Sequence, residues 1–487
     1  MPHTVQGNER PSLHSLWWGM AVSLWLAVMI LAGGTSVPSP AVLTVQTLLS
    51  AGLALLAAWR LRTGFPTWTG LAGLILLLLA LVLTLVQLIP LPPGIWMSLP
   101  GRGLVAATYQ ASGEAAPWLP LNLQPVEGYA SALALIPAFA GFLAALTLDW
   151  RNAMMVGTAL LLCALAGAVL ALTQKFAGPG QGLYFYTTPA GNIAMGTFSN
   201  RNFLAAQLFT AVPFVAALAT TATDAWRMKP WLMSLFAVIY MGILLAALAA
   251  VGSRAGVLLA MLAVFLAFAV VFRWRRFAQS GAAILAALAA LFVIGQASMV
   301  GILRLVQKDP LDDFRATIFA VSLDGVKAFF PAGSGFGSFA SAYQMFERPA
   351  DIIDNYVNHA HNDWLEIVFA GGLPALILLV AFVVLFAVTF VRLMRLSMFR
   401  HGGALYRAGG VAAFLLLLHA AVDFGLRTPA LLSVFSVCLG LATLAGAALH
   451  NHRHHATSQP DPAAASHTPR PFVPGAFGTR NAPKVQA

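Results

Sequence analysis

The side chains best suited to proton transfer lie between residues 359 and 366. This segment reads His359-Ala360-His361-Asn362-Asp363-Trp364-Leu365-Glu366. Histidine accepts a proton near neutral pH, and Asp363 and Glu366 would be i,i+3 neighbours on a helix, where either could orient an imidazole. A zinc site at His359 and His361 lacks a clear third ligand, so we predict no metal. The segment predicts either a general base or a purely structural polar turn.

Arginines accompany apolar runs at other places in the chain. Asn200, Arg201 and Asn202 open one such run, where they would either cap a helix or face an anionic or polyhydroxylated ligand. Arg254 lies in a short turn between two apolar runs, where it would either snorkel to lipid headgroups or contact a ligand. Because a guanidinium binds phosphate oxygens bidentately and keeps its charge, arginines in such places are typical of a phosphate-binding site.

The longest polar segment contains Arg315 and a predicted amphipathic helix over 316–330. Asp312 and Asp313 precede the helix and suit its N-terminus, where we expect a solvated cap rather than a metal site. The glycine-rich run at 333–337 is a weak phosphate-loop signal because it follows a helix instead of opening one.

Three ionisable residues lie in the last pair of apolar runs. His419, Asp423 and Arg427 are spaced by four, which would place them on one helical face. Ionisable groups at membrane depth are costly, so they are functional candidates. An ion pair between Asp423 and Arg427 would either lock helices together or line a site.

Composition indicates the elements that position these residues. Of 487 residues, 59% are hydrophobic and only 9% are charged, whereas soluble domains carry about 25% charged residues. We therefore predict an all-α polytopic membrane protein. Since a spanning helix needs about 20 apolar residues, twelve spans are expected, at 15–34, 41–59, 69–89, 127–148, 153–173, 202–220, 231–250, 255–272, 281–303, 365–391, 408–424 and 428–449.

The distribution of basic residues predicts the orientation. Most lie in segments that are cytoplasmic if residues 1–14 are cytoplasmic, as the positive-inside rule expects. The transmembrane domain then covers 15–450 and places three long loops outside, at 90–126, 174–201 and 304–364. The tail, 451–487, is expected to be disordered and cytoplasmic. His361 and four arginines fall on the outer side: Arg201, Arg254, Arg315 and Arg427.

Several classes of protein are disfavoured. The net charge of +11 invites a nucleic-acid partner, but the basic residues form short clusters between apolar spans instead of a stripe. Cys163 and Cys438 both fall inside apolar spans and offer no disulfide framework. The first apolar run, Trp17 to Leu31, lacks a clear small-residue cleavage site, so we expect it to be retained as a helix.

The chain resembles the O-antigen ligase and polymerase superfamily over roughly 190–430. The likeness rests on Gly196-Thr197-Phe198-Ser199-Asn200-Arg201-Asn202, on Ser253-Arg254, on Arg315 with the stretch 333–339, and on the histidine motif. The family's histidine signature, H-[NSQ]-x9-G-x-x-[GTY], reads here His361-Asn362, nine residues, Gly372 and then Leu373-Pro374-Ala375. Ala375 departs from the last position, which favours the superfamily over its strict ligase branch.

The resemblance implies a GT-C-like glycosyltransferase of the bacterial inner membrane. It would move an undecaprenyl-diphosphate-linked glycan onto an acceptor hydroxyl in the periplasm, with inversion and without a metal or other cofactor. His361 would be the general base, and Arg254 and Arg315 would bind the diphosphate. Asn200, Arg201, Asn202, Asp363, Glu366, Asp423 and Arg427 remain candidates for substrate binding or support.

Three acceptors stay open: another repeat unit in a polymerase of O-antigen or exopolysaccharide, a lipid A core in a ligase of lipopolysaccharide synthesis, or a protein in an O-oligosaccharyltransferase. The rival class is a lipid-linked oligosaccharide flippase. Such a transporter needs polar groups near the midplane, often with internal repeats, whereas the candidates here lie at the outer face.

Overall fold

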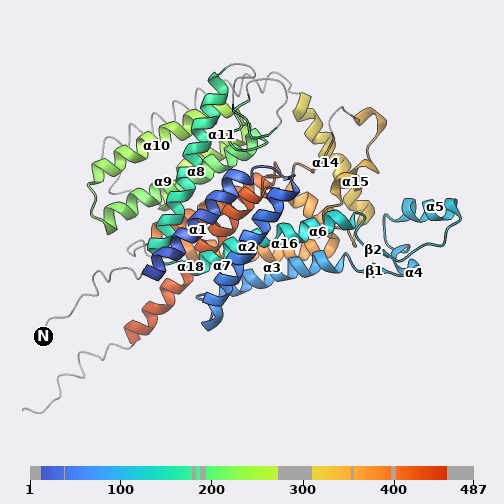
Figure 1. The fold of residues 1–487 in the computed structure, drawn as a ribbon, viewed down its shortest axis with the longest axis horizontal. Coiled ribbons are helices and arrows are strands. Elements are labelled where there is room, and N and C mark those ends of the chain that lie inside the picture. The colour runs from blue at the N-terminus through green and yellow to red at the C-terminus, as the bar shows by residue number, and fades with distance from the viewer. Residues whose placement is uncertain are drawn as a thin grey trace, which may run out of the picture. The chain divides into compact units, whose positions relative to one another are not determined.

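The computed structural model describes residues 13–37, 39–177, 183–186, 193–271, 310–352, 356–395 and 402–457, and most of these are helical (Figure 1). Nine described segments are long and apolar enough to span a membrane: Ser15–Ala32, Pro40–Thr63, Trp68–Val86, Pro125–Leu146, Trp150–Phe176, Arg201–Ala225, Pro230–Val251, Asp363–Arg395 and Gly403–Ala420. Two shorter apolar helices cover Arg254–Ala269 and Pro429–Leu444. The polytopic helical architecture is confirmed, whereas the predicted span 281–303 lies outside the described residues and the count of twelve stays a prediction.

The apolar runs correspond to the following helices: α1 (Leu13–Ala32), α2 (Pro40–Arg60), α3 (Trp68–Val86), α6 (Pro125–Ala134), α7 (Ile136–Leu146), α8 (Trp150–Phe176), α9 (Arg201–Ala225), α10 (Pro230–Val251), α11 (Arg254–Leu266), α16 (Asp363–Arg395), α17 (Gly403–Ala420) and α18 (Pro429–Thr457). The run 127–148 is therefore two helices, which meet at Leu135. The chain divides into two compact units, Met1–Gly446 and Ala447–Ala487, and the described part of the second unit is the end of α18. That helix continues past the predicted start of the tail at residue 451.

Helix α9 is the most buried of the nine candidate spans and contacts α8, α10, α11 and α17. It begins because the Asn200 side chain accepts a hydrogen bond from the Asn202 N–H, which satisfies a free donor of the first turn. Its small residues admit close neighbours: a Cβ on Gly256 of α11 would lie 2.6 Å from the Ala205 Cβ. The first turns of α9 and α11 are therefore held close together.

Helix α16 is interrupted at Gly372, shortly after the histidine motif. Gly372 adopts φ +59° and ψ −145°, and Pro374 lacks the N–H that would continue the hydrogen-bond ladder. Gly335 N–H and the Gln87 amide donate instead to the Ala370 carbonyl, and Ser334 N–H donates to the Phe369 carbonyl. The glycine run at 333–337 therefore binds the backbone of α16 at this break. Helix α14 (Pro310–Phe329) precedes the run and begins six residues before the helix predicted over 316–330.

The loop at 90–126 folds into small elements: β1 (Pro90–Leu91), α4 (Pro93–Trp96), α5 (Gly103–Ser112) and β2 (Leu119–Pro120). The two strands pair antiparallel, with Pro90 opposite Pro120 (Figure 1). Arg102 is buried and fastens this loop, because its Nη2 donates to the carbonyls of Leu121 and Gly333. Burial lowers the pKa of Arg102 to about 10.

Candidate functional site

Asp423 is the meeting point of four segments that are distant in the sequence. Its Oδ2 accepts a 2.5 Å hydrogen bond from Asn202 Nδ2 and lies 3.6 Å from Arg315 Nη2. Its Oδ1 lies 3.4 Å from His361 Nδ1 and accepts a hydrogen bond from the Phe424 N–H. The carboxylate is 1% exposed, so one buried negative charge holds an amide, a guanidinium and an imidazole together.

Asp423 lies in a turn and not on the helical face that the sequence predicted. We predicted one span over 408–424 with His419, Asp423 and Arg427 on one side, but α17 ends at Ala420. The His419 carbonyl then accepts hydrogen bonds from the N–H groups of Val422 and Asp423, and Arg427 lies in a short 3-10 helix, η4 (Gly425–Arg427). The turn sends Asp423 and Arg427 to different partners, so the anticipated pair between them does not form.

The electrostatics of Asp423 favour its charged form. Burial alone would raise the pKa of this carboxyl, but the contact with His361 and the charges of His419 and Arg315 outweigh it and lower the pKa to about 2. Asp423 therefore stays ionised at neutral pH, where it can orient an imidazole and hold Arg315.

His361 lies in a strained backbone conformation beside this carboxylate. Its φ is +50°, which is uncommon for a residue other than glycine, and its side chain remains 25% exposed. Asn362 follows and caps α16, since its side-chain oxygen accepts a hydrogen bond from Leu365 N–H. An accessible imidazole with a buried carboxylate against Nδ1 is an arrangement suited to a general base.

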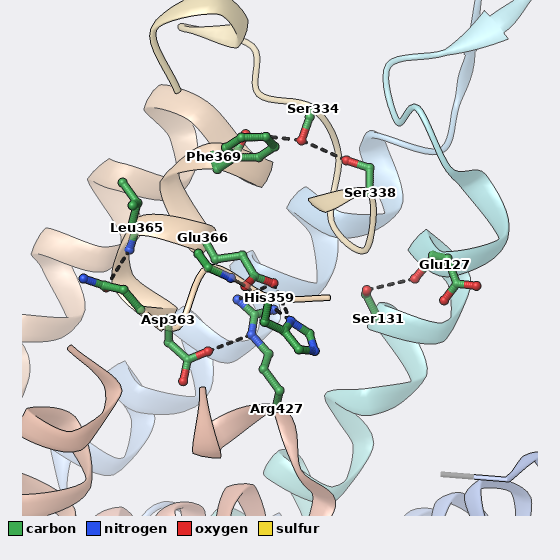
Figure 2. Close-up of polar contacts among 12 residues, drawn as sticks. Glu127, Ser131, Ser334, Ser338, His359, Asp363, Leu365, Glu366, Phe369 and Arg427 are labelled. Carbon is green, nitrogen blue, oxygen red and sulfur yellow. Dashed lines mark hydrogen bonds and ion pairs between the residues drawn. The ribbon is translucent and has the colours of Figure 1, made fainter. Parts of the chain in front are cut away.

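A second charged cluster lies next to the first and uses the other acidic residues of the motif (Figure 2). Arg427 Nε donates a 2.8 Å hydrogen bond to Asp363 Oδ1, and its Nη2 lies 3.6 Å from Glu366 Oε1. Glu366 Oε1 lies 3.0 Å from His359 Nδ1. The expected i,i+3 carboxylate pair is therefore present, but its imidazole partner is His359, whereas His361 faces Asp423.

Phe424 joins the two clusters. Its ring centroid lies 4.7 Å from that of His361 and 4.6 Å from that of His359. Phe203 of α9 supports the same ring edge-to-face at 5.1 Å. Both imidazoles thus rest on one buried aromatic side chain, and their Nδ1 atoms face different carboxylates instead of a shared metal position.

The remaining arginines of the predicted set begin helices at the same end of α9. Arg201 is the first residue of α9 and Arg254 is the first residue of α11. Ser253 caps α11 by accepting from Gly256 N–H, and Gly256 packs against Ala205, one turn beyond Asn202. The packing therefore brings Arg254 to the end of α9 from which Asn202 reaches Asp423.

Sequence reasoning overlooked several residues that build this end of the protein. Gln174 accepts hydrogen bonds from the N–H groups of Met195 and Gly196 and donates to the Leu183 and Gly196 carbonyls, which fixes the loop before Asn200. Gln87 and Asn122 bind the glycine run through Phe336, whose N–H donates to Gln87 and whose carbonyl accepts from Asn122. Gln87 and Gln174 lie at the ends of apolar helices, where a polar side chain was the available signal, whereas Asn122 lies between β2 and α6.

Part of the site lies within a region that matches a known family model. The sequence matches the family model described as O-antigen ligase over residues 236–380, which include Arg254, Arg315 and His361. No curated protein sequence gives a significant match to the chain. The family match implies a glycan transferase of the O-antigen ligase or polymerase type. The resemblance to that superfamily is confirmed, and the chain is a polytopic membrane protein whose residues 236–380 match the O-antigen ligase family model.

Proposed function

We propose that this protein transfers a glycan from an undecaprenyl diphosphate carrier to an acceptor hydroxyl on the periplasmic side of a bacterial inner membrane. The observation that carries the proposal is the convergence of His361 and Arg315 on Asp423, within reach of the first turn of α9. A base and a permanent cation beside one another suit an acceptor that must lose a proton and a leaving group that must gain negative charge.

The chemistry is a single displacement. His361 removes the proton from the acceptor hydroxyl, whose oxygen forms a bond to the anomeric carbon of the donor sugar. The bond from that carbon to the diphosphate oxygen breaks, and the configuration inverts. Since Asp423 faces Nδ1, the Nε2 atom of His361 is the one that takes the proton. Arg254 and Arg315 stabilise the departing diphosphate, so that their charge replaces that of a divalent ion.

Variants of the predicted base and cation test the reaction. His361→Ala and Arg254→Ala should each abolish glycan transfer in a strain lacking the chromosomal gene, with unchanged abundance in the membrane. The exposed Asp324, which pairs with Lys327, provides the control Asp324→Ala. Full glycan transfer by either arginine or histidine variant would refute the assignment.

The acceptor is resolved by the glycan profile of the deletion strain. If long glycan chains are lost but the lipid A core still carries single repeat units, the protein is a polymerase. If the lipid A core carries no repeat units at all, the protein is a ligase. Purified protein in liposomes that contain the extracted lipid-linked glycan on the accessible leaflet tests the transport alternative, because a flippase makes no transfer product.

A further inference from the structure

Glu366 holds two successive residues of the turn that leads to His361. Its Oε1 lies 3.0 Å and its Oε2 lies 3.3 Å from His359 Nδ1. Its Oε2 also accepts a 3.0 Å hydrogen bond from the Ala360 N–H. One carboxylate therefore grips a ring and a backbone group on the two residues directly before the predicted base (Figure 2).

The carboxylate itself is held in place. Glu366 is buried in the first turn of α16, and Arg427 approaches its Oε1 to 3.6 Å while bound to Asp363 at 2.8 Å. The Leu365 and Glu366 N–H groups are bonded to Asn362, so the helix start is also fixed. Glu366 has little freedom to turn away from His359 and Ala360.

The contacts of Glu366 with His359 and Ala360 restrain the backbone of the turn that leads to His361. His361 has φ +50°, a conformation that costs free energy for a residue with a Cβ and persists only where the surroundings impose it. The Ala360 hydrogen bond fixes the preceding peptide, and the His359 ring lies against the same Phe424 ring that His361 contacts edge-on. Release of His359 would therefore loosen both the turn and the packing around Phe424, the ring that His361 contacts.

We infer that His359 and Glu366 form a positioning pair that locks the 359–361 turn and so aims the His361 imidazole at the acceptor. The pair touches neither substrate in this account. The inference rests on the proposed function of His361, and it predicts a loss in the chemical step rather than in donor binding.

The experiment compares His359→Ala, His359→Asn and Glu366→Gln with wild type and with Asp324→Ala. His359→Ala leaves the Arg427, Asp363 and Glu366 contacts intact, whereas His359→Asn restores an N–H donor toward Glu366. Rates are measured in purified protein with lipid-linked glycan extracted from the deletion strain. Carbethoxylation of His361 by diethylpyrocarbonate, read by mass spectrometry, reports the freedom of the ring without turnover.

We expect His359→Ala to lower kcat at least 30-fold with KM for the donor changed less than 3-fold, and to speed His361 carbethoxylation at least 5-fold. His359→Asn should recover at least a third of the lost kcat. The kcat of Glu366→Gln should lie between those of His359→Ala and His359→Asn. The inference would be overturned if His359→Ala had the wild-type kcat and the wild-type rate of His361 carbethoxylation. A rise in the donor KM without a fall in kcat would also overturn it. If His361→Ala were active, the proposed function would fail instead, so the two failures are distinguishable.

Discussion

The Asn202 amide donates a 2.5 Å hydrogen bond to the Asp423 carboxylate across 221 residues of sequence. This contact ties the first turn of α9 to the turn after α17, and the same carboxylate contacts Arg315 and His361. The base and cation that the sequence predicted separately therefore share one anchor.

Asp423 should stabilise the folded protein only while it is ionised. Its pKa is lowered to about 2, so its contribution is complete above the ordinary value near 4 and is lost as pH falls from about 4 to about 2. The difference corresponds to about 2 kcal/mol. In thermal denaturation of detergent-solubilised protein, Asp423→Asn should melt below wild type at pH 6, and the gap should narrow with acidification. A gap that is constant or widens towards pH 3 would contradict this electrostatic role.

Asp363→Asn should destabilise the protein by about 2 kcal/mol, because it weakens a charge-assisted hydrogen bond from partly exposed Arg427 to a buried carboxylate. Unfolding in detergent measures this cost. Asp324→Asn is the matched control: it weakens an exposed i,i+3 pair with Lys327, and such pairs contribute little. Equal stability of the two variants would show that the buried cluster is not a structural anchor.

Much of the architecture follows from the sequence, because apolar runs long enough to cross a membrane have few alternatives to helix. The helices α3 and α8 lie close to their predicted limits. The end of α17 was missed, since a continuous apolar pattern through Val422 hides a turn stabilised by the His419 carbonyl. The ion-pair partners of Asp423 and Arg427 were also predicted wrongly, because their spacing pairs them with each other. In the structure Asp423 contacts Arg315 and Arg427 contacts Asp363, each more than 60 residues away in the sequence.

Arg102→Lys should loosen the loop at 90–126. A lysine ammonium has one nitrogen, whereas Arg102 uses Nη2 for the Leu121 and Gly333 carbonyls and Nη1 for the Pro100 carbonyl, so the loss should be about 1–3 kcal/mol. Limited proteolysis should cut within 90–126 faster in this variant. Arg62→Lys should leave the cleavage rate unchanged, because this exposed arginine donates to the Trp59 carbonyl and stacks on the Trp59 ring, away from the loop at 90–126. Equal rates in both variants would refute the anchoring role.

Gly372→Ala should disrupt the break in α16. A Cβ there would lie 2.1 Å from the Pro331 carbonyl oxygen, and the backbone has φ +59° with ψ −145°, a region closed to other residues. We expect low yield or a large fall in melting temperature, with loss of transfer. Gly242→Ala in α10 is the control, because its added Cβ meets nothing within 4 Å. A Gly372→Ala protein as stable as this control would contradict the described kink.

The most direct test of the account is the initial rate of glycan transfer by purified His361→Ala protein in liposomes, at matched protein amount and with extracted lipid-linked glycan as donor. Loss of the imidazole should reduce the rate at least 100-fold, since general base catalysis contributes about 10²–10⁴-fold. A rate within twofold of wild type would show that His361 is not the general base. It would also contradict the proposal that Asp423 orients His361 for catalysis.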